Sequence, residues 1–486
     1  MSYFDGLKIA ESYKGLEDTN PLMTQRFGAD PYAMVYDDRV YIYMTADAFE
    51  HNADKEVTEN TYGRINQINV ISTDDMVNFT DHGSIKAASD QGSAKWARNS
   101  WAPAAAWKEI NGKPKFFLYF ADAGGGIGVL QADSPAGPFE DPLGKALISR
   151  QTPECADVLW LFDPAVLSDD DGRAYLYFGG GVPEGKEADP GTARVVELGE
   201  DMISIVGEPK RIHPPYLFED SGIHKAGDKY YYTYCSNFQV DQAGTEKYGF
   251  ESGEIISMES DSPMGPFTFK EMILKNPGST FGLGGNNHHC IFRFRDKWYI
   301  TYHTRVLEKA MGVQKGYRCT HIDTFTMQED GTIGVIGQTL KGREQLRYVD
   351  AYAVNRAASF AVMGGINTVS ADEVSENCGS GNMALGDIQN GGFIKVQGVD
   401  FGSGTPTSIR MTVRNKKEET AFGAVQVRVD GLEGTVLGYL SMDDIPEGSG
   451  FTECIAQLSD QAEGVHDLYF IFAGEKYEIE TWQFVK

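Results

Sequence analysis

Cysteines are few in this sequence of 486 residues, and long apolar runs are lacking. The six cysteines, at positions 155, 235, 290, 319, 378 and 454, show neither a paired metal-binding spacing nor a dense disulfide framework. We therefore expect reduced, buried thiols. No segment approaches the run of about eighteen apolar residues that spans a membrane, and the first thirty residues contain no apolar stretch behind a basic start. These absences predict a cytoplasmic protein that does not span a membrane.

Basic side chains are also in the minority. The chain has 43 Lys and Arg against 70 Asp and Glu, which gives a formal net charge of −27. No block rich in Lys and Arg interrupts this acidity. Because such a surface repels phosphates and anionic lipids, we expect neither a nucleic-acid partner nor a membrane partner. A neutral partner, such as a sugar or a peptide, is favoured.

Helical patterns are scarce, but one other pattern recurs five times. Each copy has a small or polar start, a short apolar strand, a tight turn and a strand of alternating aromatics, which is typical of a β-hairpin. The copies span residues 30–45, 102–120, 163–178, 219–234 and 288–303. Their starts lie about 56 to 72 residues apart, so each interval has room for a hairpin and two further strands.

These repeats predict an all-β fold. One four-stranded unit cannot bury both of its faces, whereas five units around a central channel bury each other. We therefore expect a five-bladed β-propeller over residues 1–345, although an ordinary β-sandwich with coincidental hairpins is an alternative. The recurrence of DSPAGPF at 133–139 as DSPMGPF at 261–267 supports the repeat. Short alternating strands such as SIRMTVRN predict an antiparallel, jelly-roll type β-sandwich over residues 346–486.

The starts of the five hairpins are the candidate site, because the inner strands of a propeller converge on one axial pocket. These starts are Asp30, Ala102, Asp163, Glu219 and His288. Converging acids raise each other's pKa, which a purely structural core would avoid. Acid–base chemistry needs such a group, since one acid must stay protonated while another stays ionised. Each acid alone could be a turn residue or a solvated one. The prediction therefore depends on the acids occupying the same position at the starts of their hairpins.

The hairpins resemble glycoside hydrolase family 43, the five-bladed arabinofuranosidases and xylosidases. The resemblance spans residues 20–335 and rests on GADPYAMVYDDRVYIYMTAD, NSWAPAAAW, LFDPAVLSDDDGRAYLYFGGG, FEDSGIHKAGDKYYYTYCS and NNHHCIFRFRDKWYITYHTR. Among the branches of the family, the sequence is most similar to the arabinoxylan arabinofuranohydrolases, which carry a C-terminal carbohydrate-binding module of family 6.

The resemblance implies an inverting exo-glycosidase that releases terminal α-L-arabinofuranosyl groups from arabinose-substituted xylo-oligosaccharides. It implies that Asp30 is the general base, that Glu219 is the general acid and that Asp163 keeps the pKa of Glu219 high. Inversion requires the base and the acid to lie about 6.5–9.5 Å apart, so that a water molecule fits beneath the sugar.

The resemblance also implies binding groups around the acids. His288 corresponds to an axial histidine that holds a calcium ion, mostly through water. Trp101 would form an apolar wall against the sugar, while Arg305 and Asn287 would donate hydrogen bonds to its hydroxyl groups. Asp220 stands where the family commonly has a small residue, and strand alternation predicts that it points to the other face.

The C-terminal tail resembles a family 6 module in MGGI, GVDFGSG, GAVQVRVDG and GVHDLYFIFAG. It departs from that family at three positions. Ala358 stands where a structural calcium Glu is usual, and Phe451 and Cys454 stand where members often carry aromatic sugar platforms. Because a flat aromatic pair is absent there, we expect a mostly structural module with weak sugar affinity or none.

Three alternatives to an arabinofuranosidase stay open from the sequence. The nearest is a β-xylosidase on the same scaffold. A retaining fructan enzyme would use Asp30 as a nucleophile, and a carbohydrate-binding propeller would have no catalytic activity. The sequence does not indicate the oligomeric state.

Overall fold

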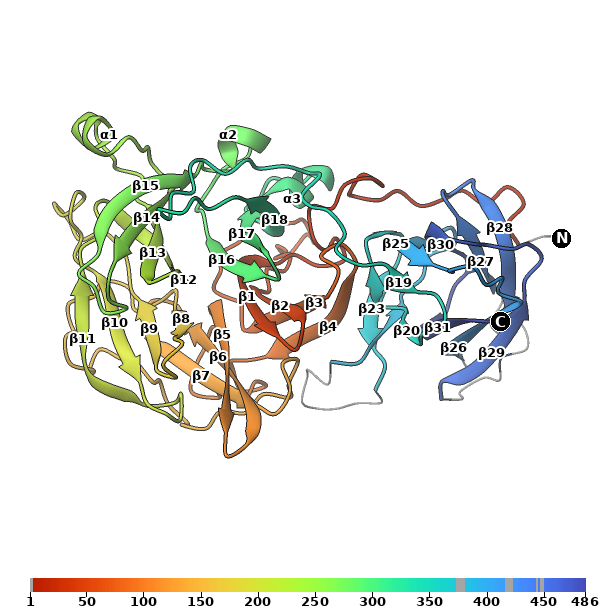
Figure 1. Cartoon of the computed structure of the whole chain (residues 1–486), viewed down its shortest axis with the longest axis horizontal. Coiled ribbons are helices and arrows are strands. Elements are labelled where there is room, and N and C mark those ends of the chain that lie inside the picture. The colour runs from red at the N-terminus through yellow and green to blue at the C-terminus, as the bar shows by residue number, and fades with distance from the viewer. Residues whose placement is uncertain (1–2, 373–380, 416–422, 443–444, 446–449) are drawn as a thin grey trace.

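The computed structural model describes residues 3–372, 381–415, 423–442, 445 and 450–486. Within these ranges the protein contains seven β-sheets and three short helices, which confirms the predicted all-β class (Figure 1). The helices are α1 (Gln242–Tyr248), α2 (Gly278–Phe281) and α3 (Val306–Ala310). No helix in the described ranges is both long and apolar enough to cross a membrane.

Five small antiparallel sheets follow one another along the first two thirds of the chain. Sheet 1 contains β1 (Ala29–Tyr36), β2 (Arg39–Thr45), β3 (Gln67–Thr73) and β4 (Phe79–Lys86), and sheet 2 contains β5 (Trp101–Ile110), β6 (Lys113–Ala121) and β7 (Ile127–Ala132). Sheet 3 contains β8 (Ala165–Ser168), β9 (Ala174–Phe178), β10 (Ala193–Leu198) and β11 (Ile205–Ile212). Sheet 4 contains β12 (Leu217–Ala226), β13 (Lys229–Ser236), β14 (Ile255–Ser260) and β15 (Thr268–Leu274). Sheet 5 contains β16 (His289–Phe294), β17 (Lys297–Thr304) and β18 (Cys319–Phe325).

The first strands of these sheets contact one another in a closed ring. β1 contacts β5, β5 contacts β8, β8 contacts β12, β12 contacts β16, and β16 contacts β1 again. All five predicted hairpins are present, because each of these strands pairs in antiparallel fashion with the strand that follows it. The ring brings the starts of the five strands together.

The repeated DSPxGPF segments link neighbouring sheets. The hydroxyl group of Tyr43 in sheet 1 donates a hydrogen bond of 2.6 Å to the carbonyl oxygen of Pro135, which follows β7 of sheet 2. Tyr177 in sheet 3 makes the same contact, also of 2.6 Å, with Pro263, which follows β14 of sheet 4. The repeat in the sequence thus reflects a repeated contact between sheets.

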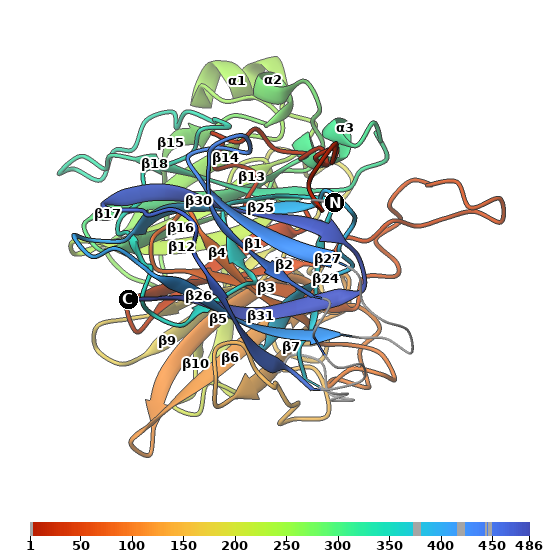
Figure 2. The ribbon, with the colours of Figure 1, turned by 90° about the vertical axis from the view of Figure 1, so that its right-hand side faces the viewer.

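Two six-stranded sheets form most of the remainder of the chain. Sheet 6 contains β19 (Val349–Asp350), β22 (Val362–Gly364), β25 (Phe393–Asp400), β27 (Gly423–Val429), β28 (Thr435–Ser441) and β30 (Val465–Gly474). Sheet 7 contains β20 (Asn355–Arg356), β23 (Asn367–Ser370), β24 (Met383–Gly386), β26 (Ser408–Asn415), β29 (Thr452–Gln457) and β31 (Tyr477–Val485). The two sheets share one apolar core, in which Phe470 of sheet 6 meets Trp482 of sheet 7 with ring centroids 5.6 Å apart. Figure 2 views this part with the five-sheet ring behind it.

The two parts are joined by more than the connecting chain. Strand β21 (Ser359–Phe360) pairs with β4 and so extends sheet 1. The N-terminal segment crosses to the second part (Figure 1), where Ala10 N donates to Gly391 O at 2.9 Å and the ammonium group of Lys395 donates to Leu16 O at 3.0 Å. We assigned this segment to the first domain from the sequence, but its apolar side chains pack on sheet 6.

The predicted state of the cysteines can be compared with the structure at five positions. Cys155, Cys235, Cys290 and Cys319 are free thiols and are buried, as predicted. Cys454 is only partly buried, which differs from the prediction. Cys378 lies outside the described residues.

The N-terminal segment is expected to stabilise the protein. Phe4 and Ile9 pack on an apolar cluster that includes Phe393 and Ile471. Replacing both Phe4 and Ile9 by Ala should lower the free energy of unfolding by about 1–3 kcal/mol, because apolar contact area is lost. Thermal or denaturant unfolding measures this loss. The control is Val354→Ala, whose side chain is 66% exposed and whose effect should stay within about 0.5 kcal/mol. A double variant as stable as this control would contradict the prediction.

Candidate active site

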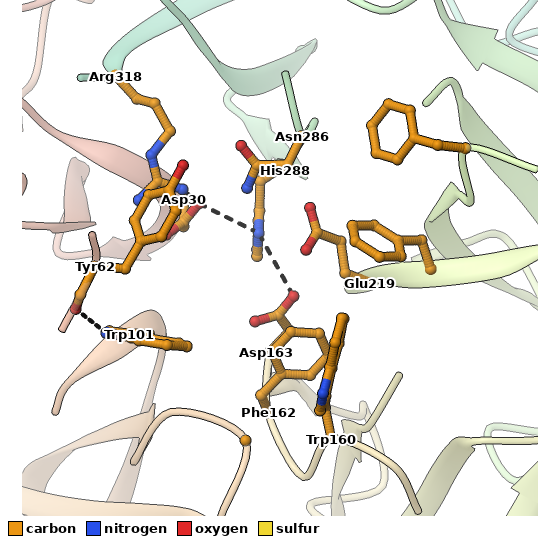
Figure 3. Close-up of a pocket in the computed structure, with 13 residues that line it drawn as sticks. Asp30, Tyr62, Trp101, Trp160, Phe162, Asp163, Glu219, Asn286, His288 and Arg318 are labelled. Atoms are coloured by element: carbon orange, nitrogen blue, oxygen red, sulfur yellow. Dashed lines mark hydrogen bonds and ion pairs between the residues drawn. The ribbon is translucent and has the colours of Figure 1, made fainter. Parts of the chain in front are cut away.

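A cavity with a volume of about 580 Å³ lies where the inner strands begin (Figure 3). This volume is in the usual range of small-molecule sites. The lining combines polar and charged side chains with aromatic ones. The polar and charged residues are Asp30, Asp163, Glu219, Asn286, His288 and Arg318, and the aromatic residues are Tyr62, Trp101, Trp160, Phe162, Phe218 and Phe238.

The three predicted carboxylates share this cavity. Asp30, Asp163 and Glu219 are buried, with exposed fractions of 4%, 4% and 7%. His288 lies among them: its Nδ1 atom is 3.5 Å from Asp30 Oδ1 and 3.8 Å from Asp163 Oδ2. Figure 3 shows Asp30 and Glu219 on opposite sides of His288. A sugar bound between them would therefore have a carboxyl group on either side.

The inner strands begin with an irregularity that positions these acids. Pairing with the next strand shifts register within 29–32 of β1, 101–104 of β5 and 219–222 of β12. Within each shift one residue has a positive φ angle, namely Asp30 at 47°, Ala102 at 42° and Asp220 at 69°. Such bulges re-aim side chains and are common beside active sites.

The strand pairing also corrects the predicted alignment of Glu219 with Asp30. Glu219 pairs with Cys235 as Trp101 pairs with Ala121, and both positions precede the bulge. Asp220, rather than Glu219, is therefore the structural equivalent of Asp30. In sheet 4 the predicted equivalent of Asp30 is displaced by one residue. The sequence does not show where the bulge lies, so it does not show which of the two adjacent acids matches Asp30. Glu219 still lines the cavity.

Strand alternation predicted that Asp220 points to the opposite face, but in the structure it does not. It is fully buried, with Oδ1 only 3.1 Å from Nε2 of His288. His289 contacts the other carboxylate oxygen through Nδ1 at 2.5 Å. The backbone N–H of Asp220 donates to Asp163 Oδ2 at 2.9 Å. Because the bulge disturbs alternation, Asp220 lies against the groups that line the cavity.

Asp30 is the acid of the cavity that contacts a cationic side chain. Arg318 Nη1 donates to its Oδ1 at 2.9 Å, and His303 Nδ1 lies 3.1 Å from the same oxygen. Burial raises the pKa of Asp30, but the Arg318 guanidinium, with smaller contributions from His288 and His303, outweighs this effect and holds the pKa far below its usual range. Asp30 is therefore ionised at neutral pH.

The other two acids have the opposite character. Burial raises the pKa of Glu219 well above its usual value, and the charges of Asp163 and Asp30 raise it further. Burial likewise raises the pKa of Asp163, and Asp30 adds to this effect. The Oε1 atom of Glu219 is buried and has no hydrogen-bond partner among the described residues. A protonated Glu219 can thus donate to a bound molecule.

Two of the predicted sugar-binding residues lie elsewhere. Asn287 is buried and donates from Nδ2 to the carbonyl oxygen of Gly253 at 3.1 Å, whereas its neighbour Asn286 lines the cavity. Arg305 pairs with Glu308 and lines a smaller adjoining cavity of about 60 Å³. The position of a residue relative to its hairpin does not show whether that residue or a neighbour lines the cavity.

Arg318 was not predicted, although it lines the cavity. It immediately precedes β18, outside the five hairpins in which we sought the site. The only available signal was chemical: a buried acidic cluster needs a cation. That requirement does not indicate which arginine supplies it.

Aromatic side chains form the walls of the cavity. Trp101 lines it as predicted and donates from Nε1 to the carbonyl oxygen of Tyr62 at 3.0 Å. On another side, Phe218 makes edge-to-face contacts with Trp160 at 5.6 Å and with Phe238 at 5.5 Å. Phe238 is 51% exposed and extends this wall to the surface. Such surfaces suit the apolar faces of sugar rings.

The calcium ion predicted near His288 would be held mostly through water, and the described residues offer it no set of direct ligands. Among the described residues, no group of three or more His, Cys, Asp or Glu side chains is arranged to hold a metal. Both ring nitrogens of His288 already face carboxylates. Calcium usually takes about six to eight oxygen ligands.

Comparisons with known proteins show the family of this chain. The sequence matches the model of glycosyl hydrolases family 43 over residues 19–333 and that of carbohydrate binding module family 6 over residues 356–486. An arabinoxylan arabinofuranohydrolase from Paenibacillus polymyxa is 45% identical over 484 residues, which cover 96% of this chain and 74% of the relative. A second one, from Bacillus subtilis, is 44% identical over 492 residues, which cover 97% of this chain and 93% of the relative.

A solved structure extends the likeness to the whole chain. The crystal structure of a family 43 arabinoxylan arabinofuranohydrolase from Bacillus subtilis, in complex with cellotetraose, matches with a TM-score of 0.92 and 43% identity. The match covers 98% of this chain and 99% of that one. On the family match, and with paired acids in the cavity, this chain is a glycoside hydrolase that belongs to glycosyl hydrolase family 43.

Proposed function

We propose that the protein is an inverting, exo-acting α-L-arabinofuranosidase that removes terminal arabinofuranosyl groups from arabinoxylan-derived oligosaccharides. The observation that carries this proposal is the pair of opposed carboxyl groups: Asp30 has a lowered pKa and Glu219 a raised one. The names of the two relatives support the choice of sugar.

In the proposed reaction, Glu219 donates its proton to the glycosidic oxygen as the bond from this oxygen to the anomeric carbon breaks. Asp30 accepts a proton from a water molecule, whose oxygen bonds to the anomeric carbon from the opposite face. The products are arabinose of inverted configuration and an oligosaccharide with a free hydroxyl group. Proton exchange with water then restores both carboxyl groups.

We propose supporting roles for the other residues of the cavity. Asp163 keeps the pKa of Glu219 high by like-charge repulsion. Trp101 covers an apolar face of the sugar, while Arg318 and Asn286 replace the predicted Arg305 and Asn287 as donors to its hydroxyl groups.

We also propose that the five sheets are the blades of a β-propeller and that sheets 6 and 7 form a jelly-roll β-sandwich. The closed ring of contacts and the family matches support this architecture, with domains over 1–345 and 346–486. In the second domain, the Arg414 guanidinium lies 4.3 Å from the centre of the Phe451 ring, which favours a structural role over sugar binding. A hydrated calcium ion near His288, measurable by metal analysis, and a cytoplasmic location stay predictions.

The catalytic roles can be tested by Asp30→Asn and Glu219→Gln. Each should lower kcat on an arabinoxylan oligosaccharide by about three or more orders of magnitude, because a proton acceptor or donor is lost. Glu219→Gln should lose less activity on a nitrophenyl arabinofuranoside, whose leaving group needs little protonation. The control is Asp169→Asn, a buried acid that pairs with Lys225 outside the cavity. A carbohydrate-binding propeller without catalytic activity predicts no effect in any of these variants.

The substrate and the stereochemistry have a separate test. Hydrolysis of nitrophenyl α-L-arabinofuranoside should exceed that of nitrophenyl β-D-xyloside, and NMR of the first-formed sugar should show inverted configuration. Preference for the xyloside would identify a β-xylosidase on the same scaffold. A first product of retained configuration would indicate that Asp30 acts as a nucleophile.

The role of Asp163 predicts a change in the pH profile. Activity needs protonated Glu219, so kcat/KM falls as the pH rises through the raised pKa of this group. Asp163→Asn removes a like charge, which should lower the pKa of Glu219 and move the alkaline limb to lower pH. An unchanged alkaline limb in a folded variant would contradict this role.

A further inference from the structure

Arg318 is held by a buried acid that lies outside the main cavity. Asp47 accepts three hydrogen bonds from Arg318: from the backbone N–H at 3.1 Å, from Nε at 3.0 Å and from Nη2 at 2.9 Å. The Asp47 side chain has no exposed surface. This paired geometry is the strong, directional form of an arginine–carboxylate contact.

Asp47 therefore determines how Arg318 meets Asp30. With its Nε–Nη2 edge on Asp47, Arg318 contacts Asp30 through Nη1 alone, at 2.9 Å from Oδ1. The contacts from His303 and His288 go to Oδ1 as well. No hydrogen bond or ion pair from the described residues engages Oδ2 of Asp30. That oxygen stays available for a water molecule.

If Arg318 paired with both oxygens of Asp30, Asp30 would have no free oxygen with which to act as a base. An unrestrained guanidinium group beside a buried carboxylate favours two parallel hydrogen bonds, one to each oxygen. Such a pair would occupy both oxygens of Asp30. The contact between Asp47 and Arg318 opposes this rotation.

We infer that Asp47 is a positioning residue of the reaction: it fixes Arg318 so that Asp30 keeps one carboxylate oxygen for the attacking water. The inference rests on the proposed role of Asp30 as the base. It extends the site to a residue that touches neither the substrate nor the reacting atoms, because Asp47 acts through Arg318.

The chain offers a control in a second arginine–aspartate pair, in which the aspartate is buried and the arginine is partly exposed. Arg26 contacts Asp81, whose side chain is 1% exposed, and also donates to Thr368 Oγ1 at 3.1 Å. This pair joins sheet 1 to the second part of the molecule. None of its members lines the active-site cavity.

The experiment compares Asp47→Asn, Asp81→Asn and Asp30→Asn in the full chain, with kcat, KM and the unfolding midpoint measured for each. Asp47→Asn should lower kcat on nitrophenyl arabinofuranoside by about 10- to 100-fold, as expected for a misplaced reacting group, with KM within about threefold. Asp81→Asn should lower the unfolding midpoint to a similar extent but leave kcat within about twofold.

The outcomes separate the inference from the proposed function. If Asp30→Asn is inactive and folded Asp47→Asn keeps kcat within about threefold of the parent, the inference is wrong and the proposed base stands. If Asp30→Asn stays active, the proposed function fails first. Should Asp47→Asn not fold, Arg318→Lys replaces it, because lysine cannot bridge both acids with the same fork. A folded Arg318→Lys enzyme with unchanged kcat would then overturn the inference.

Discussion

The chemistry of this site depends on one buried cation in a cavity of acids. Burial raises the pKa of every carboxyl group there, so the acids would share one character without a further charge. Arg318 breaks this symmetry because it contacts Asp30 and neither of the other two acids. Asp30 therefore stays ionised, whereas the pKa values of Asp163 and Glu219 are raised. The proposed base and the proposed acid thus arise from the same residue chemistry, and the position of one guanidinium group is the largest source of their difference.

That position depends on how the ring of sheets closes. Asp30 lies in β1 and Asp47 in the connection between β2 and β3, all within sheet 1, whereas Arg318 leads into β18 of sheet 5. The chain before β1 runs beside β18, where Gly28 N donates to Arg318 O at 3.0 Å and Leu22 N donates to Thr320 O at 2.9 Å. The first and last sheets are thereby joined next to the cavity. The difference in pKa between Asp30 and the other two acids therefore depends on this closure, so the fold and the electrostatics of the cavity are coupled.

The parts of this architecture that the sequence predicted are those encoded locally. Hairpins follow from turn residues and strand alternation, and the starts of three hairpins located Asp30, Asp163 and Glu219, although Asp220 rather than Glu219 is the register equivalent of Asp30. Longer-range features were missed. Arg318 reaches the cavity from outside the hairpins, and the N-terminal segment packs on a part of the molecule hundreds of residues away. Neither contact leaves a periodic signal, because each is fixed by tertiary packing rather than by the neighbours in the sequence.

Access to the cavity, rather than pKa, favours Glu219 over Asp220 as the proposed acid. Burial raises the pKa of both groups well above their usual values. The oxygens of Asp220, however, are occupied by His288 and His289, and its side chain does not line the cavity. Glu219 lines the cavity, and its Oε1 has no partner among the described residues. A proton on Asp220 would have no route to a bound sugar, whereas a proton on Glu219 faces it. The bulge in β12 thus places Glu219 at the cavity and Asp220 against His288.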